Sequence, residues 1–244
     1  MRRASSRRSS GVRRRAPARR ARAAAGVVVL AKYPRPGRVK TRLARAIGSE
    51  AACALYRAFV LDLARRLRRQ RADLWWAYAP ARAPFAALVG SRRCFAQRPG
   101  DLGTRIAHAL AVVRRHGYGA AIAIGADMPH VSRRALAAAA RALARGADVV
   151  LGPARDGGYY LIGVRASQPV LFRDVPWGTA RVLDVTRRRC RRLGLTLVEV
   201  ATGFDVDEAR DLAPFRGVVQ SRPREFPCSR RVLARLAATT SRRQ

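Results

Sequence analysis

Two hydrophobic periods alternate along the chain. Short runs without polar residues, such as VVVL at 27–30 and AAIAIG at 120–125, are typical of strands buried on both faces. Between such runs apolar residues recur every three or four positions, as in residues 49–69, which is the period of a helix that buries one face. The predicted strands are 27–30, 73–79, 94–97, 120–125, 148–151, 159–164 and 196–200. The predicted helices are 49–69, 84–89, 102–116, 132–145, 179–193 and 208–215, with a further helix start near residue 40.

This alternation predicts an α/β fold in which a mostly parallel sheet carries helices on both faces. The ends of the chain do not follow it. Residues 1–25 hold ten Arg and no acid, so we expect a disordered tail, although an Arg/Ser-rich leader also resembles a transit peptide. Residues 218–244 form a second basic extension, in which 229–237 could make a docking helix. We therefore expect the domain to span 26–217 and to fold without the tails.

The composition is strongly basic, with 51 Lys and Arg against 15 Asp and Glu and a net charge of +36. Such a charge favours polyanions, anionic membrane surfaces or phosphorylated substrates. A general bias toward Ala and Arg explains the same numbers without any ligand. No stretch approaches the ~20 apolar residues of a membrane span. The four Cys are far apart, which indicates neither a disulfide framework nor a zinc site and favours a reducing cytoplasm.

A cationic loop follows the first predicted strand. Pro34, Pro36 and Gly37 hold it open before a helix begins near Lys40 or Thr41, and backbone N–H groups at such a helix start converge on anions. The chain has only two lysines, and both are in this loop. Lysine is a compact charge that binds phosphate, so the loop predicts a phosphate site, with a solvated basic loop as the alternative. The cations of the loop are Lys32, Arg35, Arg38, Lys40 and Arg42.

Five of the 15 acids follow predicted strands, at the sheet edge where ligands of α/β proteins bind. Carboxylates beside a cationic loop can hold Mg²⁺ together with substrate phosphates, and Asp127 with one or both of Asp205 and Asp207 could supply the ligands. Each also has a structural interpretation, because Asp127 could cap the next helix and Asp205 or Asp207 the last one. Asp156 could belong to a plain turn. The five acids are Asp101, Asp127, Asp156, Asp205 and Asp207.

Six motifs in order resemble one family, the glycosyltransferase-like bacterial transferases associated with radical-SAM and selenodomain proteins (DUF2064), some of which are placed in arsenosugar biosynthesis. The motifs are AKYPRPGRVKTRL, QRPGDLGTRI, GADMP, LGPARDGGYYLIGV, VPWGT and FDVDEARDL, and they cover about residues 26–216. Phospholactate guanylyltransferases are similar more distantly, through KTRLA and DVDEARDL. The resemblance implies a Rossmann-like GT-A fold of the nucleotide-diphospho-sugar transferase type.

The same resemblance implies roles for individual residues. Lys32, Lys40 and Arg42 would hold the nucleotide phosphates, Asp127 would bind the metal, and Asp205 or Asp207 would bind it from the other side. Around these we assign Gly37, Gln97, Asp101 and Arg105 to nucleotide binding and Asp127 and Asp156 to catalysis. To the substrate side we assign Gly157, Gly158, Tyr159, Trp177 and Thr179, with Thr179 also as a helix N-cap.

Three functions remain open at this point. The first is a glycosyltransferase that moves a sugar from a nucleoside-diphosphate sugar to a small acceptor, with Mg²⁺ or Mn²⁺ as cofactor. The second is a guanylyltransferase-like nucleotidyltransferase that uses an NTP and a phosphorylated small molecule. The third is a nucleic-acid-binding protein with an idle transferase site, but no recognition motif for nucleic acid is present and aromatics are not interleaved with the Arg runs. We expect any nucleic-acid contact to be non-specific and confined to the Arg-rich tails.

Overall fold

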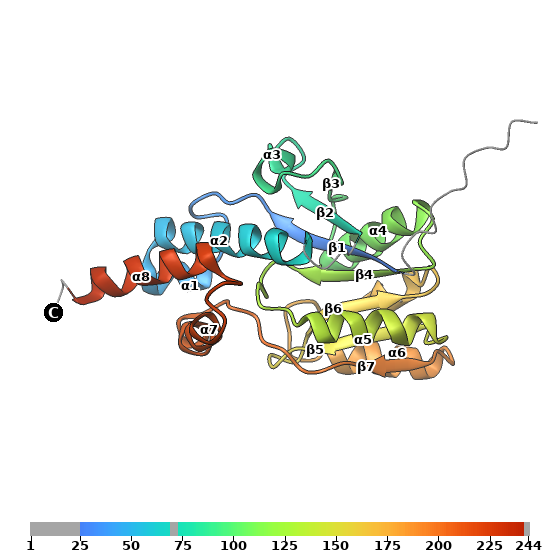
Figure 1. Cartoon of the computed structure of the whole chain (residues 1–244). Helices are drawn as coiled ribbons and strands as arrows, with labels where there is room; N and C mark the ends of the chain where they lie inside the picture. The colour runs from blue at the N-terminus through green and yellow to red at the C-terminus, as the bar shows by residue number, and fades with distance from the viewer. Residues whose placement is uncertain (1–24, 69–72, 242–244) are drawn as a thin grey trace, which may run out of the picture.

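The computed structural model describes residues 25–68 and 73–241 (Figure 1). The disordered tail expected at 1–25 lies outside these residues except for Ala25. In the described part a seven-stranded sheet has the order β3-β2-β1-β4-β6-β5-β7. Every predicted strand is present, with ends shifted by a few residues. The strands are β1 Ala25–Lys32, β2 Leu74–Ala79, β3 Cys94–Ala96, β4 Ala120–Gly125, β5 Val149–Pro153, β6 Tyr159–Val164 and β7 Leu197–Glu199.

The sheet is parallel except at β6, which runs antiparallel to both β4 and β5. The reason is the short connection after β5, where the Gly158 carbonyl accepts from the Ala154 N–H at 3.0 Å and Gly157 has a φ of +85°. A tight turn of this kind can join only antiparallel neighbours, because a parallel crossover needs a dozen or more residues. As a result Tyr159 begins β6 at the edge where the parallel strands end.

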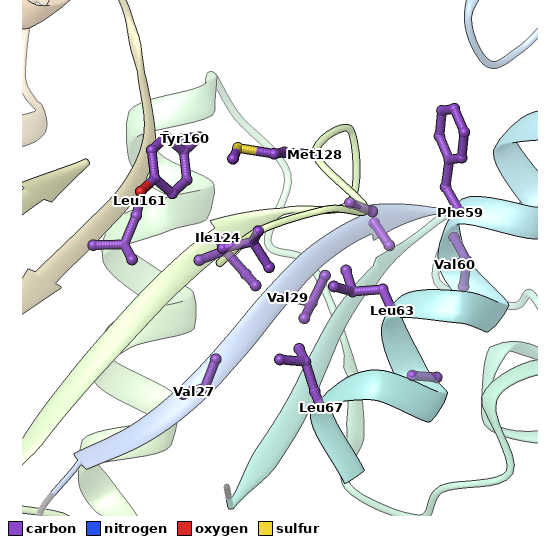
Figure 2. Close-up of a cluster of buried hydrophobic side chains, with 14 of the residues drawn as sticks. Val27, Val29, Phe59, Val60, Leu63, Leu67, Ile124, Met128, Tyr160 and Leu161 are labelled. Carbon is purple, nitrogen blue, oxygen red and sulfur yellow. The ribbon is translucent and has the colours of Figure 1, made fainter. Parts of the chain in front are cut away.

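Helices cover both faces of the sheet, as the alternation predicted. One face packs against α2 (Ser49–Arg68) and α5 (Arg133–Ala144), and the other against α4 (Leu102–Arg115), the 3₁₀ helix η1 (Pro169–Phe172) and α6 (Val182–Arg192). Figure 2 shows Val27 and Val29 of β1 turned toward Leu63 and Leu67 of α2. Val28 is equally buried in the opposite layer, which explains why β1 has no polar residue at its centre. Two short helices, α1 (Thr41–Ile47) and α3 (Phe85–Val89), flank the strand ends.

The C-terminal segment belongs to the folded body, which corrects the expected boundary at residue 217. Helix α7 (Ala209–Ser221) runs through that position, and α8 (Pro227–Ser241) lies beside α2 (Figure 1). Phe226 is fully buried and Leu233 nearly so. The carboxylate of Asp62, in the middle of α2, accepts from the backbone N–H groups of Cys228 at 3.0 Å and Ser229 at 2.8 Å. This buried carboxylate caps the start of α8 and fixes it to α2.

A buried arginine of α2 connects the same segment to the loop after β4. Arg66 pairs with Glu225 at 2.9 Å, and its guanidinium also donates to the carbonyl oxygens of Pro129 and Val131, the latter at 3.1 Å. The Phe226 ring lies 4.7 Å from the guanidinium carbon, measured to the ring centroid. The cation is therefore satisfied on every side despite its burial. None of the helices in the described ranges is long and apolar enough to cross a membrane.

The stability of this region should fall in acid because of His130. Its ring is buried against Phe204, at 4.2 Å between centroids, and neither ring nitrogen has a hydrogen-bond partner within the described residues. Burial, reinforced by Arg66 and other nearby arginines, lowers the pKa of His130 to about 3. An unfolded histidine takes up a proton below about pH 6.5, whereas the folded one stays neutral, so the unfolded state gains stability as the pH falls from 6.5 toward 3.

We expect this histidine alone to lower the free energy of unfolding by about 2 kcal/mol between pH 7.5 and pH 5. The variant His130→Phe keeps an aromatic ring and removes the titration, so its stability should decline less over the same range. Urea unfolding of both proteins at several pH values measures the difference. Identical pH dependence in the two proteins would contradict the prediction.

Candidate functional site

A cleft lies at the edge where β1 and β4 end. After β1 the chain builds β2 and β3 on one side and then returns to β4 on the other, so this edge is the topological switch point at which α/β sheets bind ligands. The cleft has a volume of about 390 Å³, which is in the range of small-molecule sites. Its lining includes the cations Lys32, Lys40, Arg42 and Arg105, the carboxylates Asp127, Asp205 and Asp207, and the side chains of Tyr56, Gln97, Tyr159 and Tyr160.

Lys40 is at the centre of the polar side of this cleft. It precedes α1 in a left-handed conformation with φ of 49°, and its side chain is only 2% exposed. The ammonium pairs with Asp127 and donates to Asp207 Oδ1 at 2.7 Å, and the ring centroids of Tyr56 and Phe59 lie 5.8 Å away. Burial alone would lower the pKa of Lys40, but the two carboxylates outweigh it and raise the pKa. The ammonium therefore stays charged.

The carboxylates come from two loops that are joined through their backbones. The Val206 N–H donates to the Asp127 carbonyl at 3.1 Å, which aligns residues 205–207 with the loop after β4. Both helix-cap interpretations are wrong, because Ser132 caps α5 and Glu208 caps α7. Burial, together with the charges of Asp127 and Asp207, raises the pKa of Asp205 to about 7. The cleft thus brings three carboxyl groups together beside its four cations.

The two predicted phosphate-binding lysines occupy different environments. Lys32 is exposed at the end of β1, and its backbone N–H donates to the Tyr56 hydroxyl at 2.9 Å. Arg42 is more than half exposed and bridges Asp207 and Glu208, at 2.7 and 2.9 Å. Lys32 and Arg42 can reach a ligand from solvent, whereas Lys40 is held inside by carboxylates. The sequence pattern alone did not distinguish them.

Two uncharged groups organise the floor of the cleft. The Gln97 side-chain amide donates to the carbonyl oxygens of Ala31 and Ala77, at 3.1 and 2.8 Å, and so ties the ends of β1 and β2 together. Tyr56 of α2 is 3% exposed and its hydroxyl holds the backbone of Lys32. Gln97 was predicted from the sequence, whereas Tyr56 was not. The available signal was a phenol inside the apolar stripe of residues 49–69, but burial in a core explains that pattern equally well.

Of three further residues predicted to bind the nucleotide, two lie outside the cleft and one lines it. Gly37 is an exposed turn glycine with φ of +71°. Asp101 caps α4 by accepting from the Thr104 N–H at 2.8 Å. Arg105 does line the cleft, and its guanidinium donates to the Gly100 carbonyl at 3.0 Å.

Three further predicted residues, Asp156, Gly157 and Gly158, lie in the turn before β6. Asp156 accepts from the Gly158 N–H at 2.9 Å, so the plain-turn interpretation is confirmed, although Asp156 also lines a groove next to Asp205 and Asp207. A side chain at Gly157 would lie 2.3 Å from the Ala180 carbonyl oxygen, so packing against the chain itself requires this glycine.

On the substrate side, Tyr159 lines the cleft and Trp177 packs edge-on against it, with ring centroids 6.2 Å apart. Thr179 is not a helix cap, which is a correction. Helix α6 begins at Val182 after Arg181, and the Thr179 hydroxyl instead donates to the Pro176 carbonyl at 2.8 Å. The loop 176–179 therefore closes on itself before the helix starts.

The chemistry of the cleft suits a divalent ion only in part. Carboxylate oxygens are the ligands that Mg²⁺ and Mn²⁺ prefer, and Asp127, Asp205 and Asp207 present them at one place. Within the described residues, however, no three His, Cys, Asp or Glu side chains are arranged to hold one ion. Mg²⁺ commonly uses one or two carboxylates with phosphate oxygens and water, so the residues fit an ion that arrives with a phosphorylated ligand.

Comparison with known proteins agrees with the resemblance. Residues 60–179 match the family described as "Uncharacterized protein conserved in bacteria (DUF2064)". A crystal structure from Desulfovibrio desulfuricans G20, provisionally described as a nucleotide-diphospho-sugar transferase, is 34% identical, with a TM-score of 0.81 over 89% of this chain and 96% of that one. None of the curated proteins compared matches this chain.

Two more distant structures share the fold. One is a CMP:2-keto-3-deoxy-manno-octonic acid synthetase complexed with CTP, at 14% identity and a TM-score of 0.53 over 81% of this chain and 98% of that one. The other is a cytidylyltransferase from Leptospira borgpetersenii serovar Hardjo-bovis, at 11% identity and a TM-score of 0.52 over 84% and 97%. The Rossmann-like nucleotide-diphospho-sugar transferase fold expected from the sequence is confirmed.

Proposed function

The chain belongs to the DUF2064 family, and from this membership and the charges of its cleft we propose that it is a transferase that uses a nucleotide-activated donor. In the form we favour, it is a metal-dependent glycosyltransferase that moves a sugar from a nucleoside-diphosphate sugar to a small acceptor. The observation that carries the proposal is the pairing of a cationic loop with a carboxylate cluster at the switch point of the sheet. The 34% identical structure supports it through its own description as a nucleotide-diphospho-sugar transferase.

The proposed chemistry follows from where charge develops. In sugar transfer an acceptor oxygen bonds to the anomeric carbon, the bond from that carbon to the diphosphate breaks, and the acceptor proton passes to a carboxylate of the cluster. Negative charge then grows on the leaving phosphate oxygens. Lys32, Arg42 and Arg105 line the cleft and are placed to donate to those oxygens. A divalent ion held by Asp127 with Asp205 or Asp207 would supply Lewis-acid stabilisation of the same charge.

A nucleotidyltransferase is the second candidate. The same cations would then stabilise pyrophosphate as it leaves an NTP, and a phosphorylated acceptor would form the new bond to the α-phosphorus. The cytidylyltransferase that shares this fold supports this alternative at the level of architecture alone. The groove that adjoins the cleft does not separate the two candidates by charge, because its five acids are accompanied by Arg42, Arg155 and Arg210.

A thermal-shift panel separates the candidates. The full chain is heated with UDP-, GDP- and dTDP-sugars and with NTPs, each with and without Mg²⁺ or Mn²⁺. Metal-dependent stabilisation by a nucleotide sugar supports the glycosyltransferase, because a ligand that binds only the folded state raises the melting temperature. Stabilisation by NTPs supports the nucleotidyltransferase. The absence of any metal-dependent shift across the panel would contradict both.

Asp127→Asn tests the proposed metal ligand. The amide keeps the shape of the side chain and loses its charge. The increase in nucleotide affinity that Mg²⁺ or Mn²⁺ produces should therefore largely disappear. Lys40 keeps Asp207 as a partner, so the loss of unfolding free energy should be about 1 kcal/mol. Calorimetric nucleotide titrations with and without metal measure the first effect and urea unfolding the second.

The matched control is Asp184→Asn, which removes the same charge from an exposed position of α6. This control should leave the metal-dependent increase in nucleotide affinity unchanged. If Asp127→Asn behaves like this control, Asp127 is not a metal ligand.

A further inference from the structure

A second groove runs along the opposite side of α4 from the cleft. It lies between that helix and residues 164–174 and has a volume of about 540 Å³, and no residue lines both it and the cleft. We call it the α4 groove. Leu102, Arg105 and Ile106 of α4 face the cleft, whereas the α4 groove takes the other side of the same helix. Its basic lining residues are Arg98, Arg114, Arg115 and Arg173, and the uncharged ring of His108 lies among them.

The charges of the α4 groove are unbalanced. No ion pair joins any of its four arginines to a carboxylate within the described residues. Two acids, Asp101 and Asp174, also line it, so four arginines against two acids leave an excess of two positive charges. Asp101 accepts from the Thr104 N–H at 2.8 Å as the cap of α4. An anion in the groove would offset this excess.

Two residues that line the α4 groove each have one buried nitrogen atom without a hydrogen-bond partner in the described part of the chain. The atoms are Nη1 of Arg114 and Nδ1 of His108. Nη1 of Arg114 is a donor, and native proteins almost always satisfy buried donors. Neither atom is open to the groove as it stands, so a ligand reaches them only when these side chains turn toward it.

The outer wall of the α4 groove is held in place from behind. Arg189 of α6 donates to the carbonyl oxygens of Val170 and Leu171, both at 3.3 Å, to that of Asp174 at 3.1 Å, and to that of Arg173. Arg189 does not line the groove, so these carbonyl oxygens are satisfied by the protein itself. The wall therefore needs no ligand to keep its shape, and a ligand would meet a preformed site.

We propose that the α4 groove is a binding site for a small anion that carries phosphate groups, separate from the nucleotide site of the cleft. Phosphate oxygens match the planar fork of arginine and can accept from several guanidinium groups at once. The volume admits a molecule larger than inorganic phosphate. Because α4 also lines the cleft, the bound anion contacts the same helix that contributes Arg105 to the cleft.

Histidine NMR provides a direct test, because the chain has only three histidines and only His108 lines this groove. The full chain, labelled at histidine, is titrated with inorganic pyrophosphate in about 0.15 M salt, which screens loose surface charge. We expect saturable shifts of the His108 ring signals and none at the buried His130. In Arg98→Gln/Arg173→Gln the pyrophosphate concentration for half-saturation should rise at least tenfold. Both arginines are exposed, so this variant should fold.

The matched control is Arg133→Gln/Arg134→Gln, which removes two exposed arginines from the start of α5 and changes the net charge equally. It should leave the His108 titration unchanged. Arg114→Gln should weaken binding further and serves as a third variant. If His108 does not shift with pyrophosphate, or if the α5 control weakens the response as much as the groove variant, the proposed site does not exist. If His108 responds only to an oligonucleotide, the groove binds nucleic acid and the proposal is wrong.

Discussion

A chain that ends at residue 217 is expected to lose its native fold, not only a tail. The deletion removes Val219, Phe226 and Leu233 from the main core and uncovers the face of α2 that carries Asp62, which loses its N–H donors. Loss of one buried Phe side chain typically costs about 3–5 kcal/mol, and the loss of the buried Leu and Val side chains adds to it. The sum approaches the whole stability of a typical domain, about 5–15 kcal/mol. Circular dichroism and urea unfolding of residues 25–217 against 25–241 measure the effect.

Point variants make this prediction independent of solubility. Phe226→Ala should lower the free energy of unfolding by about 3–5 kcal/mol, because Phe226 is fully buried against Phe215 and Arg66. Arg231→Ala on the exposed side of α8 should change it by less than about 0.5 kcal/mol. A folded 25–217 chain with the stability of 25–241 would contradict our assignment of α8 to the domain.

The sequence indicated this helix only as a possible docking helix at 229–237 and not as part of the domain, for a physical reason. Its apolar positions, such as Leu233 and Leu236, are interspersed with arginines, and an amphipathic helix without its partner looks like a basic tail. The residue of α2 that holds this helix was equally hard to recognise in the sequence. Asp62 interrupts the apolar stripe of α2, where a charged residue usually marks the solvent face, yet it is fully buried because it caps another helix. Such a contact between residues far apart in the sequence is not visible in local periodicity.

The strands β1, β4, β5 and β6 were predictable because they are buried on both faces and therefore contain no polar residue at their centres. The direction of β6 was not predictable from its composition, which is that of a parallel strand. Only the short turn at Asp156 and Gly157 indicated a hairpin, and the same residues had an interpretation as a ligand loop. When a residue pattern is typical of both a turn and a ligand-binding loop, only the three-dimensional structure distinguishes the two.

The carboxylate cluster was predictable because strand ends in a parallel sheet meet at one edge. Asp127, Asp205 and Asp207 do line one cleft at this edge. The position of the strand ends could not show which cation they face, because side-chain direction depends on the left-handed conformation of Lys40. The structure therefore adds to the predicted phosphate role of Lys40 a buried pairing with two predicted metal ligands.

Lys40→Met is accordingly expected to change the affinities for metal and nucleotide in opposite directions. Without the ammonium, Asp127 and Asp207 have lost their buried counter-charge, and the free protein should bind Mn²⁺ at least tenfold more tightly, a gain of about 1.4 kcal/mol. Methionine fills the same space against Tyr56 and Phe59 without a charge. If the ammonium also reaches the phosphates when a nucleotide is bound, nucleotide affinity should fall by about 1–3 kcal/mol.

Lys32→Met is the matched control for this pair of effects. Lys32 is exposed and has no carboxylate partner within the described residues, so its loss should weaken nucleotide binding without strengthening Mn²⁺ binding to the free protein. Mn²⁺ titrations followed by electron paramagnetic resonance, and nucleotide titrations by calorimetry, separate the two effects without any assay of turnover. Equal or weaker Mn²⁺ binding in Lys40→Met would mean that the ammonium does not compete with metal. Lys40 would then act as a structural link between the loop after β4 and residues 205–207, and the metal, if one binds, would occupy a different set of carboxylates.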